Sequence, residues 1–330
     1  MSLDLTLRLI ESVNSTPAGR TTIIDIAGPT DLAVAQRWAA ATGNTLLTVH
    51  PGGVEILRGP MTDPIEALPE DRRPGYRLWL YTNFHCNLAC DYCCVESSPR
   101  TSPRVLSTPD FAEFVDQAVG AGVRELYITG GEPFMLLDLD ERLRVALARL
   151  PTTVLTNAML WRGERRERLD ALPRADLTLQ VSLDSATATL HDRHRGTGSF
   201  DRTIDGIQLA ITLGFRVRVA ATLGHDAGTA ETDLTTLCDS LGLGPDQRIV
   251  RRVAKQGAAT QGQRVSRASL VPEVCVTVDG VWWHPVAATD PAMKVADCWV
   301  PLDEAIRSVR AEYREHRVRG DVLANTFPCA

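Results

Sequence analysis

The stretch YTNFHCNLACDYCCVE, residues 81–96, is the most informative part of this chain, because it holds four of the eight cysteines. It overlaps RLWLYTNF (77–84), whose apolar and aromatic residues predict a β-strand, so the cysteines lie on the loop at the C-terminal end of that strand. Three close thiolates can hold three corners of an iron–sulfur cube, whereas a cluster ligated entirely by protein needs four. The C-x3-C-x2-C spacing of Cys86, Cys90 and Cys93 therefore predicts a 4Fe–4S site with one iron left open.

A structural zinc site is the alternative that the cysteine spacing leaves open. Zinc normally takes four ligands, and Cys94 or His85 is available as the fourth. Adjacent side chains on an extended backbone point apart, so Cys94 is not expected to share a cluster with Cys93. We interpret Cys94 as a small buried hydrophobic residue.

Composition restricts the class of protein. The chain has 330 residues, of which 44% are hydrophobic, enough for one main domain with additions. The first residues do not form a secretory signal and no stretch approaches 18 apolar residues, which predicts a soluble, cytoplasmic protein without a membrane segment. The net charge of -6, with acids and bases interspersed, gives no basic footprint for nucleic acid. A small-molecule or peptide substrate is expected instead.

The chain from residue 76 to 255 alternates apolar strands with helical segments, which is typical of a parallel α/β sheet. Six such units predict a partial (β/α)6 barrel, with functional residues at the C-terminal ends of its strands. In the first helix we expect Thr108 as the N-cap, followed by Pro109. The predicted strands are 77–84, 125–130, 153–158, 177–184, 215–223 and 247–254, and the helices 108–122, 139–150, 163–173, 199–214 and 227–241.

Two further regions flank the predicted barrel. Residues 1–75 form a small α+β module, with strands in TTIIDIA, TLLTVH and GVEILRG, a helix in DLAVAQRWAAATG, and a turn at Pro51-Gly52-Gly53. This module carries no motif; it either offers a sheet edge to a peptide or only covers the barrel. Residues 61–77 are predicted to form a linker. Residues 256–330 form a C-terminal extension with short strands around VCVTVDGVWWHP and a helix near 301–319.

The cysteine loop resembles that of the radical S-adenosylmethionine superfamily, C-x3-C-x-aromatic-C, with Tyr92 as the aromatic residue. The resemblance covers about residues 77–255 and implies a partial barrel of the TIM type. It also implies that S-adenosylmethionine binds the open iron and is cleaved to a 5'-deoxyadenosyl radical, which abstracts a hydrogen atom from a substrate in natural-product or cofactor biosynthesis. An electron donor such as flavodoxin or ferredoxin is implied as well. The competing hypothesis is a non-enzymatic iron–sulfur or zinc-binding regulatory protein on the same fold.

Other motifs match positions that this family uses for S-adenosylmethionine. The pair Gly130-Gly131 begins GGEP, where the backbone is expected to approach the ligand closely and Glu132 to accept hydrogen bonds from its ammonium group. Arg195, in HDRHRGTGSF, is expected to pair with the methionine carboxylate. His191 and His194 are expected to be polar loop residues. The remaining residues that the resemblance assigns to the cofactor are Tyr92 near the adenine, Ser182 and Asp184 near the ribose or carboxylate, and Thr156 and Asn157 in a T-N-G position where Ala158 replaces glycine.

The C-terminal extension resembles a degenerate SPASM or twitch domain, a type that holds auxiliary clusters. Asp279-Gly280 fits its D-G-x4-Cys turn, but Pro285 stands where the cysteine belongs. Cys275, Cys298 and Cys329 either hold a second iron–sulfur cluster or are unrelated thiols. We expect one of Trp282 and Trp283 to be core, because neighbours on a strand face opposite ways.

Overall fold

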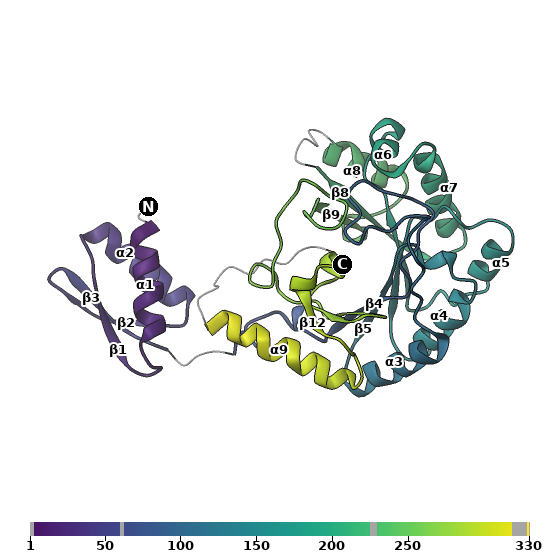
Figure 1. Ribbon diagram of the computed structural model, residues 1–330. Coiled ribbons are helices and arrows are strands. Elements are labelled where there is room, and N and C mark those ends of the chain that lie inside the picture. Colours follow the sequence, from purple (N-terminus) through teal and green to yellow (C-terminus); the bar gives the residue numbers. More distant parts are fainter. Residues whose placement is uncertain (1–2, 60–62, 225–229, 319–328, 330) are drawn as a thin grey trace. The chain divides into compact units, whose positions relative to one another are not determined.

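The computed structural model describes residues 3–59, 63–224, 230–318 and 329 (Figure 1). The chain divides into two compact units, which comprise residues 1–69 with 311–323, and residues 70–310 with 324–330. Part of the predicted linker, residues 61 and 62, lies outside the described residues, as do the first residues of the helix predicted over 227–241.

The smaller unit is a three-stranded antiparallel sheet with two helices. Its strands pair in the order β1-β3-β2, and β2 and β3 form the predicted hairpin, with Gly52 in the turn at a φ of 85°. The first helix was not predicted, although Leu5, Leu9 and Val13 recur at the spacing of one helical face and are buried. The elements are α1 (Leu3–Ser15), β1 (Thr21–Asp25), α2 (Pro29–Ala41), β2 (Thr45–His50) and β3 (Gly53–Leu57).

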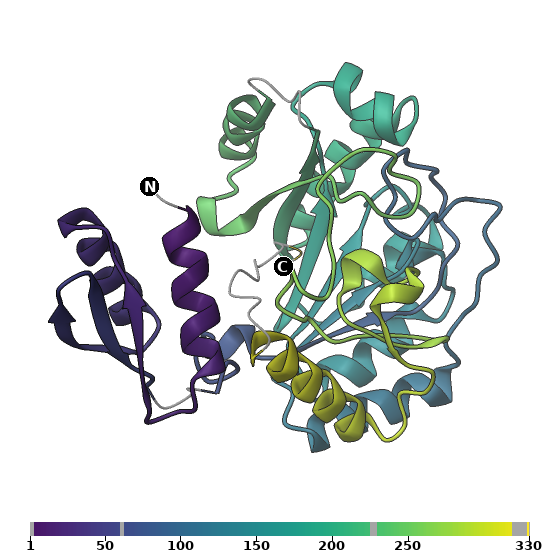
Figure 2. The same cartoon turned by 60° about the vertical axis from the view of Figure 1, so that its left-hand side comes forward.

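The larger unit contains the predicted partial barrel, and the α/β fold class is confirmed. Its first six strands lie side by side in chain order and are all parallel. In both views (Figures 1 and 2) the helices that link them lie outside the curved sheet. The elements are β4 (Arg77–Tyr81), α3 (Thr108–Gly120), β5 (Glu125–Thr129), α4 (Leu139–Leu147), β6 (Thr152–Thr156), α5 (Glu164–Asp170), β7 (Leu177–Ser182), α6 (Ala188–Arg195), α7 (Ser199–Thr212), β8 (Arg216–Leu223), α8 (Ala230–Ser240) and β9 (Arg248–Arg252).

The N-cap of α3 lies one residue before the predicted cap. Ser107, not Thr108, is the N-cap, because its Oγ accepts a hydrogen bond from the Asp110 backbone N–H at 3.1 Å. Thr108 Oγ1 instead donates to Asp138 Oδ2 at 2.7 Å. The apolar residues Phe111, Phe114, Val115 and Ala118 recur at helical spacing and are all buried.

Helix α6 was predicted as a loop, which is wrong. His191 and His194 lie on this helix, and the side chain of His191 is fully buried. Gly196, at a φ of 106°, ends the helix in a conformation that favours glycine. The polar sequence HDRHR hid the helix, because it has no apolar periodicity to reveal one.

The C-terminal extension adds three strands to the barrel sheet at the edge formed by β4. Strand β10 (Cys275–Thr277) runs parallel to β4, and β11 (Gly280–Trp282) and β12 (Lys294–Ala296) follow antiparallel. Both Trp282 and Trp283 are buried, so the expectation of a single core tryptophan was too narrow. The last helix is α9 (Leu302–Val318), and single turns of 3-10 helix occur at Glu70–Arg72, Pro133–Met135, Pro245–Gln247, Pro285–Ala287 and Pro291–Met293.

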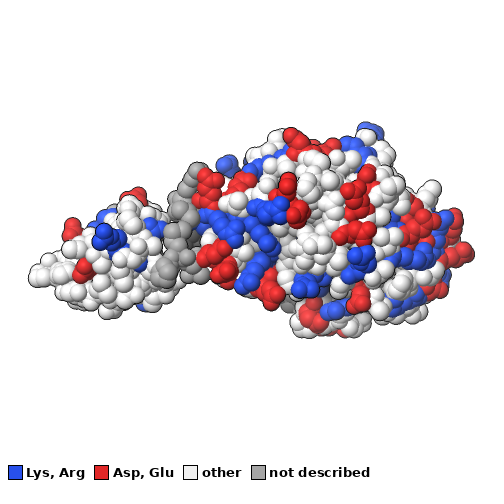
Figure 3. Space-filling view, turned by 90° about the horizontal axis from the view of Figure 1, so that it is seen from below, with Lys and Arg blue, Asp and Glu red and all other residues white. Residues whose placement is uncertain are grey.

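The surface offers two observations on partners. On the face shown in Figure 3, acidic and basic side chains are interspersed over the larger unit. Among the described residues, no helix combines the length and the apolar character needed to cross a membrane.

Candidate active site

A cavity of about 1030 Å³ lies where the parallel strands of the larger unit end, and part of it opens to solvent. It brings together residues from all six parallel strands, β4 to β9, and from the loops that follow them, which agrees with the position predicted for a site on this fold. Of the predicted site residues, those that line it are Cys86, Cys90, Tyr92, Cys93, Gly130, Gly131, Glu132, Thr156, Asn157, Ser182, Arg195 and Cys329.

All four cysteines of the loop, Cys86, Cys90, Cys93 and Cys94, line this cavity. The backbone N–H of Leu88 donates to Cys86 Sγ at 3.4 Å, and that of Ser97 donates to Cys93 Sγ at 3.2 Å. Burial raises the pKa of Cys86 to about 12 and that of Cys90 to about 11, so these thiols lose their protons only to a strong partner such as a metal. Sulfur atoms that face one cavity and receive backbone N–H groups suit an iron–sulfur cluster.

The paired glycines of GGEP accommodate the cysteine loop itself. A Cβ on Gly130 would lie 2.2 Å from Asn83 Oδ1, and one on Gly131 would lie 2.1 Å from the His85 carbonyl oxygen. The sequence predicted close approach of the backbone to a ligand, whereas here the close neighbour is the chain at residues 83–85. The glycines therefore fix the position of the loop that carries the thiols.

Substitution of Gly131 by alanine is expected to destabilise the protein by about 3 kcal/mol, because a methyl group in contact with backbone forces the cysteine loop to move. Less iron should then be retained after reconstitution. Chemical denaturation and iron analysis measure the two effects. Gly120→Ala is the matched control, since its Cβ would meet nothing within 4 Å. Equal stability of the two variants would contradict the role assigned to Gly131.

Glu132 joins the ends of strands β5 and β6. Its carboxylate accepts hydrogen bonds from the Thr156 hydroxyl at 2.8 Å, from the Asn157 backbone N–H at 2.8 Å and from the Phe134 backbone N–H at 3.1 Å. Burial raises the pKa of Glu132 to about 7, although these donors act in the opposite direction. Thr156 and Asn157, the first two residues of the predicted T-N-G position, thus donate hydrogen bonds to the Glu132 carboxylate. Ala158, the third residue, has a φ of 61°, a conformation that favours glycine.

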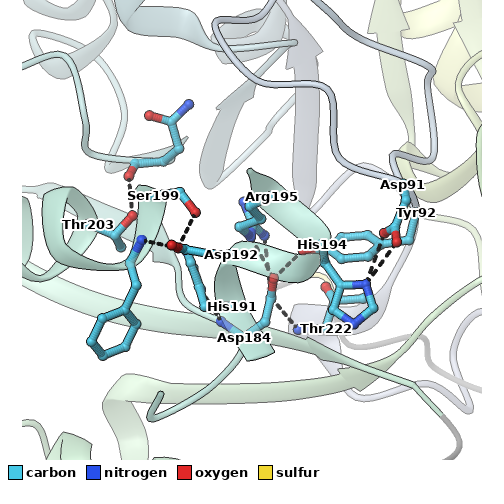
Figure 4. Close-up of polar contacts among 12 residues, drawn as sticks. Asp91, Tyr92, Asp184, His191, Asp192, His194, Arg195, Ser199, Thr203 and Thr222 are labelled. Carbon is cyan, nitrogen blue, oxygen red and sulfur yellow. Dashed lines mark hydrogen bonds and ion pairs between the residues drawn. The ribbon is translucent and has the colours of Figure 1, made fainter. Parts of the chain in front are cut away.

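Asp184 and Arg195 form a buried ion pair (Figure 4). Arg195 Nε donates to Asp184 Oδ2 at 2.5 Å and Nη2 donates to Oδ1 at 3.3 Å. The Tyr92 hydroxyl also donates to Oδ2, and the Thr222 backbone N–H donates to Oδ1 at 2.9 Å. Burial alone would raise the pKa of Asp184, but the Arg195 charge and these donors hold it below its ordinary value.

This pair changes the interpretation of three predicted residues. The carboxylate of Asp184 is occupied by protein donors, and Asp184 is not among the residues that line the cavity, so it positions Arg195 instead of facing a ligand. Tyr92 contributes through its side chain, whose hydroxyl donates a hydrogen bond to Asp184. Arg195 lines the cavity and is held there by Asp184.

The segment around α6 contains functional contacts that sequence reasoning missed. His191 Nδ1 accepts a hydrogen bond from the Asp184 backbone N–H at 3.3 Å, and burial lowers the pKa of His191 to about 4, which keeps the ring neutral. Asp192 accepts hydrogen bonds from the backbone N–H groups of Gly198 at 2.6 Å and Phe200 at 2.8 Å, at the start of α7. The available signal was the two glycines Gly196 and Gly198 directly before α7, which indicate a turn whose backbone N–H groups need a partner.

The predicted auxiliary set of cysteines is not assembled in the described residues. Cys298 is exposed, and its Sγ accepts from the Val300 backbone N–H at 3.5 Å. Cys275 is fully buried, and its electrostatic neighbours are Cys94, Cys329 and Glu273. The structure thus groups Cys275 and Cys329 with Cys94. Cys275 lies near Cys94 because β10 pairs with β4, the strand that leads into the cysteine loop.

Comparison with known proteins finds similarity over the barrel part of the chain. The sequence profile of the Radical SAM superfamily matches residues 80–235. The AdoMet-dependent heme synthase of Oleidesulfovibrio alaskensis is 31% identical over 212 residues, which cover 62% of this chain and 53% of that protein. The mycofactocin maturase MftC of Mycobacterium tuberculosis is 35% identical over 161 residues, which cover 47% of this chain and 40% of that protein. This chain therefore spans about half the length of these relatives.

A solved structure supports the same fold. The structure titled native anSMEcpe with bound AdoMet has a TM-score of 0.54 and 12% identity, and the match covers 73% of this chain and 82% of that one. At this identity the likeness shows the fold alone. The match to this family supports the two predicted cofactors, a 4Fe–4S cluster and S-adenosylmethionine. It covers most of the residues that line the cavity. Residues 80–235 of this chain are thus similar in sequence to the Radical SAM superfamily.

Proposed function

We propose that this protein is an enzyme that reductively cleaves S-adenosylmethionine and uses the resulting 5'-deoxyadenosyl radical to abstract a hydrogen atom from a substrate. The observation that carries the proposal is the single cavity shared by the thiols of Cys86, Cys90 and Cys93 and the guanidinium of Arg195. The thiols are needed for the iron atoms and the guanidinium for the carboxylate of S-adenosylmethionine. The reaction needs both of these, and the substrate, in one cavity.

Each group has a role in this proposal. Cys86, Cys90 and Cys93 hold the 4Fe–4S cluster, which supplies the electron that cleaves the sulfonium and an open iron for the methionine part. Arg195, oriented by Asp184, pairs with the methionine carboxylate through its remaining N–H groups. The other cavity residues that we assign to S-adenosylmethionine are Tyr92, Gly130, Gly131, Glu132, Thr156, Asn157 and Ser182.

The competing proposal is a zinc-binding or regulatory protein. A single zinc ion needs ligand atoms that converge at about 2.0–2.3 Å from one point. In the part of the chain that the structure describes, no three side chains of His, Cys, Asp or Glu are arranged to hold one metal ion. The similarity of residues 80–235 to the Radical SAM superfamily, whose cysteine spacing Cys86, Cys90 and Cys93 follow, favours a cluster instead.

A cleavage assay separates the two proposals. Protein reconstituted anaerobically with iron and sulfide is mixed with S-adenosylmethionine and dithionite, and the products are followed by liquid chromatography and mass spectrometry. The enzyme proposal requires 5'-deoxyadenosine and methionine in equal amounts. Their absence, with the cluster present, would overturn it in favour of the regulatory protein.

We propose a peptide as the substrate class, and natural-product biosynthesis as the setting. Support comes from the printed names of similar proteins: a mycofactocin maturase, the subtilosin biosynthesis protein AlbA of Bacillus subtilis, and the SuiB structure bound to its precursor peptide SuiA. A flavodoxin or ferredoxin in the cytoplasm is the electron donor that we expect for such an enzyme.

Iron content tests whether a second cluster exists. About four iron atoms per chain are expected if the Cys86, Cys90 and Cys93 site is alone, and about eight if Cys275, Cys298 and Cys329 hold another. We expect four, because Cys298 is exposed and is not an electrostatic neighbour of Cys275. Replacement of these three cysteines by alanine should then leave the iron content unchanged, whereas a loss of half the iron would establish the auxiliary cluster.

A further inference from the structure

Three thiols outside the proposed cluster site gather around Tyr81 on the inner side of β4. Besides burial, Cys94, Cys275 and Cys329 contribute to raising the pKa of the Tyr81 hydroxyl, which places them all within electrostatic range of it. Cys275 and Cys329 are themselves near Cys94. These thiols come from the cysteine loop, from β10 and from residue 329, so the fold brings them together from distant parts of the chain.

The three thiols differ in their access to the cavity. Cys94 and Cys329 line it, whereas Cys275 does not and has no exposed surface. The Tyr81 hydroxyl donates a hydrogen bond to the Pro285 carbonyl oxygen at 2.9 Å. Cys329 is therefore the thiol that faces the cavity outside the cysteine loop.

Residue 329 is attached to the centre of the barrel. Its carbonyl oxygen accepts a hydrogen bond at 3.0 Å from Nε2 of Gln180, a buried residue of β7. The side chain of Cys329 is only 7% exposed. Burial raises the pKa of its thiol above the ordinary value, and the Arg251 charge opposes this only in part, so the sulfur keeps its proton at neutral pH.

We propose that the Cys329 thiol is a hydrogen-atom donor to carbon radicals formed in this cavity. The inference rests on the proposed function, because it requires a radical. A thiol S–H bond is weaker than most C–H bonds, so transfer of its hydrogen atom to a carbon radical is favourable. A group that lines a radical-forming cavity and keeps its hydrogen is suited to this step.

The proposed step balances as follows. The 5'-deoxyadenosyl radical takes a hydrogen atom from a substrate C–H bond, which leaves a substrate carbon radical. The S–H bond of Cys329 breaks homolytically and its hydrogen forms the new C–H bond, which leaves a thiyl radical. One electron from a low-potential one-electron reductant, of the class that reduces the cluster, and one proton from solvent restore the thiol. The substrate ends at its original oxidation level, so the reaction class is a redox-neutral change at carbon, such as inversion of a stereocentre.

The experiment needs no identified substrate, because the 5'-deoxyadenosyl radical itself can accept the hydrogen atom. Reconstituted full-length protein is equilibrated in D2O, in buffer free of added thiols, so that the S–H of Cys329 becomes S–D. S-adenosylmethionine and dithionite are added, and the deuterium content of 5'-deoxyadenosine is measured by mass spectrometry. The wild-type protein should give mainly singly deuterated product.

Two substitutions of Cys329 test the assignment. Cys329→Ser keeps a small polar side chain, but an O–H bond is too strong to donate its hydrogen atom, and Cys329→Ala removes the donor entirely. Both should reduce the deuterium content to the level of Cys329-independent background, while iron content and affinity for S-adenosylmethionine stay at the wild-type values. The matched control is Cys275→Ser, which alters a neighbouring buried thiol outside the cavity lining and should retain the wild-type label.

The outcomes separate this inference from the proposed function. If the wild-type protein with its cluster forms no 5'-deoxyadenosine, the proposed function fails and the inference fails with it. If 5'-deoxyadenosine forms but both Cys329 variants keep the wild-type deuterium content, only the assignment of Cys329 is overturned. Loss of label in Cys94→Ala alone, with iron retained, would likewise overturn Cys329 and move the donor to Cys94.

Discussion

Replacement of Cys90 by alanine is expected to abolish formation of 5'-deoxyadenosine and to remove the cluster iron from the reconstituted protein. A cluster held by three thiolates has no spare protein ligand, so the loss of one leaves two irons without support. The same result is expected for Cys86 and Cys93. Iron analysis, the absorbance of the cluster and the cleavage assay measure these effects.

Cys94 supplies the matched control, because it is the fourth thiol of the same loop and also lines the cavity. Cys94→Ala should keep the iron content and the 5'-deoxyadenosine yield of the wild-type protein. If Cys94→Ala lost its metal as completely as Cys90→Ala, the site would have four cysteine ligands, and the zinc or fully ligated cluster alternatives would replace the proposed function.

Substitution of Asp184 by asparagine is expected to cost about 3–5 kcal/mol of stability, because it leaves the charge of Arg195 buried without its counterion. The two side chains are only 4% and 8% exposed, so solvent does not compensate. The free energy of unfolding, measured by urea denaturation, tests this. Affinity for S-adenosylmethionine should fall as well, since Asp184 orients the guanidinium that we assign to the methionine carboxylate.

The pH dependence of this pair has a definite sign. The pKa of Asp184 is lowered in the folded protein, so its stabilising contribution is present above its ordinary pKa of 3.8 and is lost as the pH falls through the lower folded value. Asp184→Asn should lack this acid-dependent loss.

The nearby pair of Asp91 and His194 provides the comparison. It has a similar distance of 2.9 Å, but its side chains are 58% and 40% exposed. Asp91→Asn should therefore cost less than about 1 kcal/mol. If Asp91→Asn and Asp184→Asn were equally destabilised, burial would not be the cause of the effect assigned to Asp184.

The sequence predicted most of the barrel, and most of the predicted site residues line the cavity. Strands such as β4 and β7 carry long apolar runs, and local pattern is enough to identify them. Contacts between distant residues were not predictable in this way. Nothing local indicates that Asp184 would bind Arg195 and Tyr92, or that Gly131 would be needed for the carbonyl group of His85, because both depend on how loops from different strands pack.

The helices that were missed illustrate a second limit. α6 has no apolar stripe, because its buried residues are His191 and Arg195, and both are hydrogen-bonded to Asp184, two residues after β7. The grouping of Cys329 with Cys94 was equally hidden. It results from the hydrogen bond between Gln180 and the backbone of residue 329, which joins positions 149 residues apart.

The pairing of β10 with β4, through Cys275 opposite Trp79 and Val276 opposite Leu80, bears on any attempt to isolate a minimal barrel. Cutting the chain after residue 255 would remove β10 and leave β4 as an uncovered edge strand containing three fully or nearly fully buried apolar residues, Leu78, Trp79 and Leu80. Bare apolar edges pair with other chains. Such a fragment is expected to aggregate, so the extension protects the barrel from self-association in addition to any part it takes in catalysis.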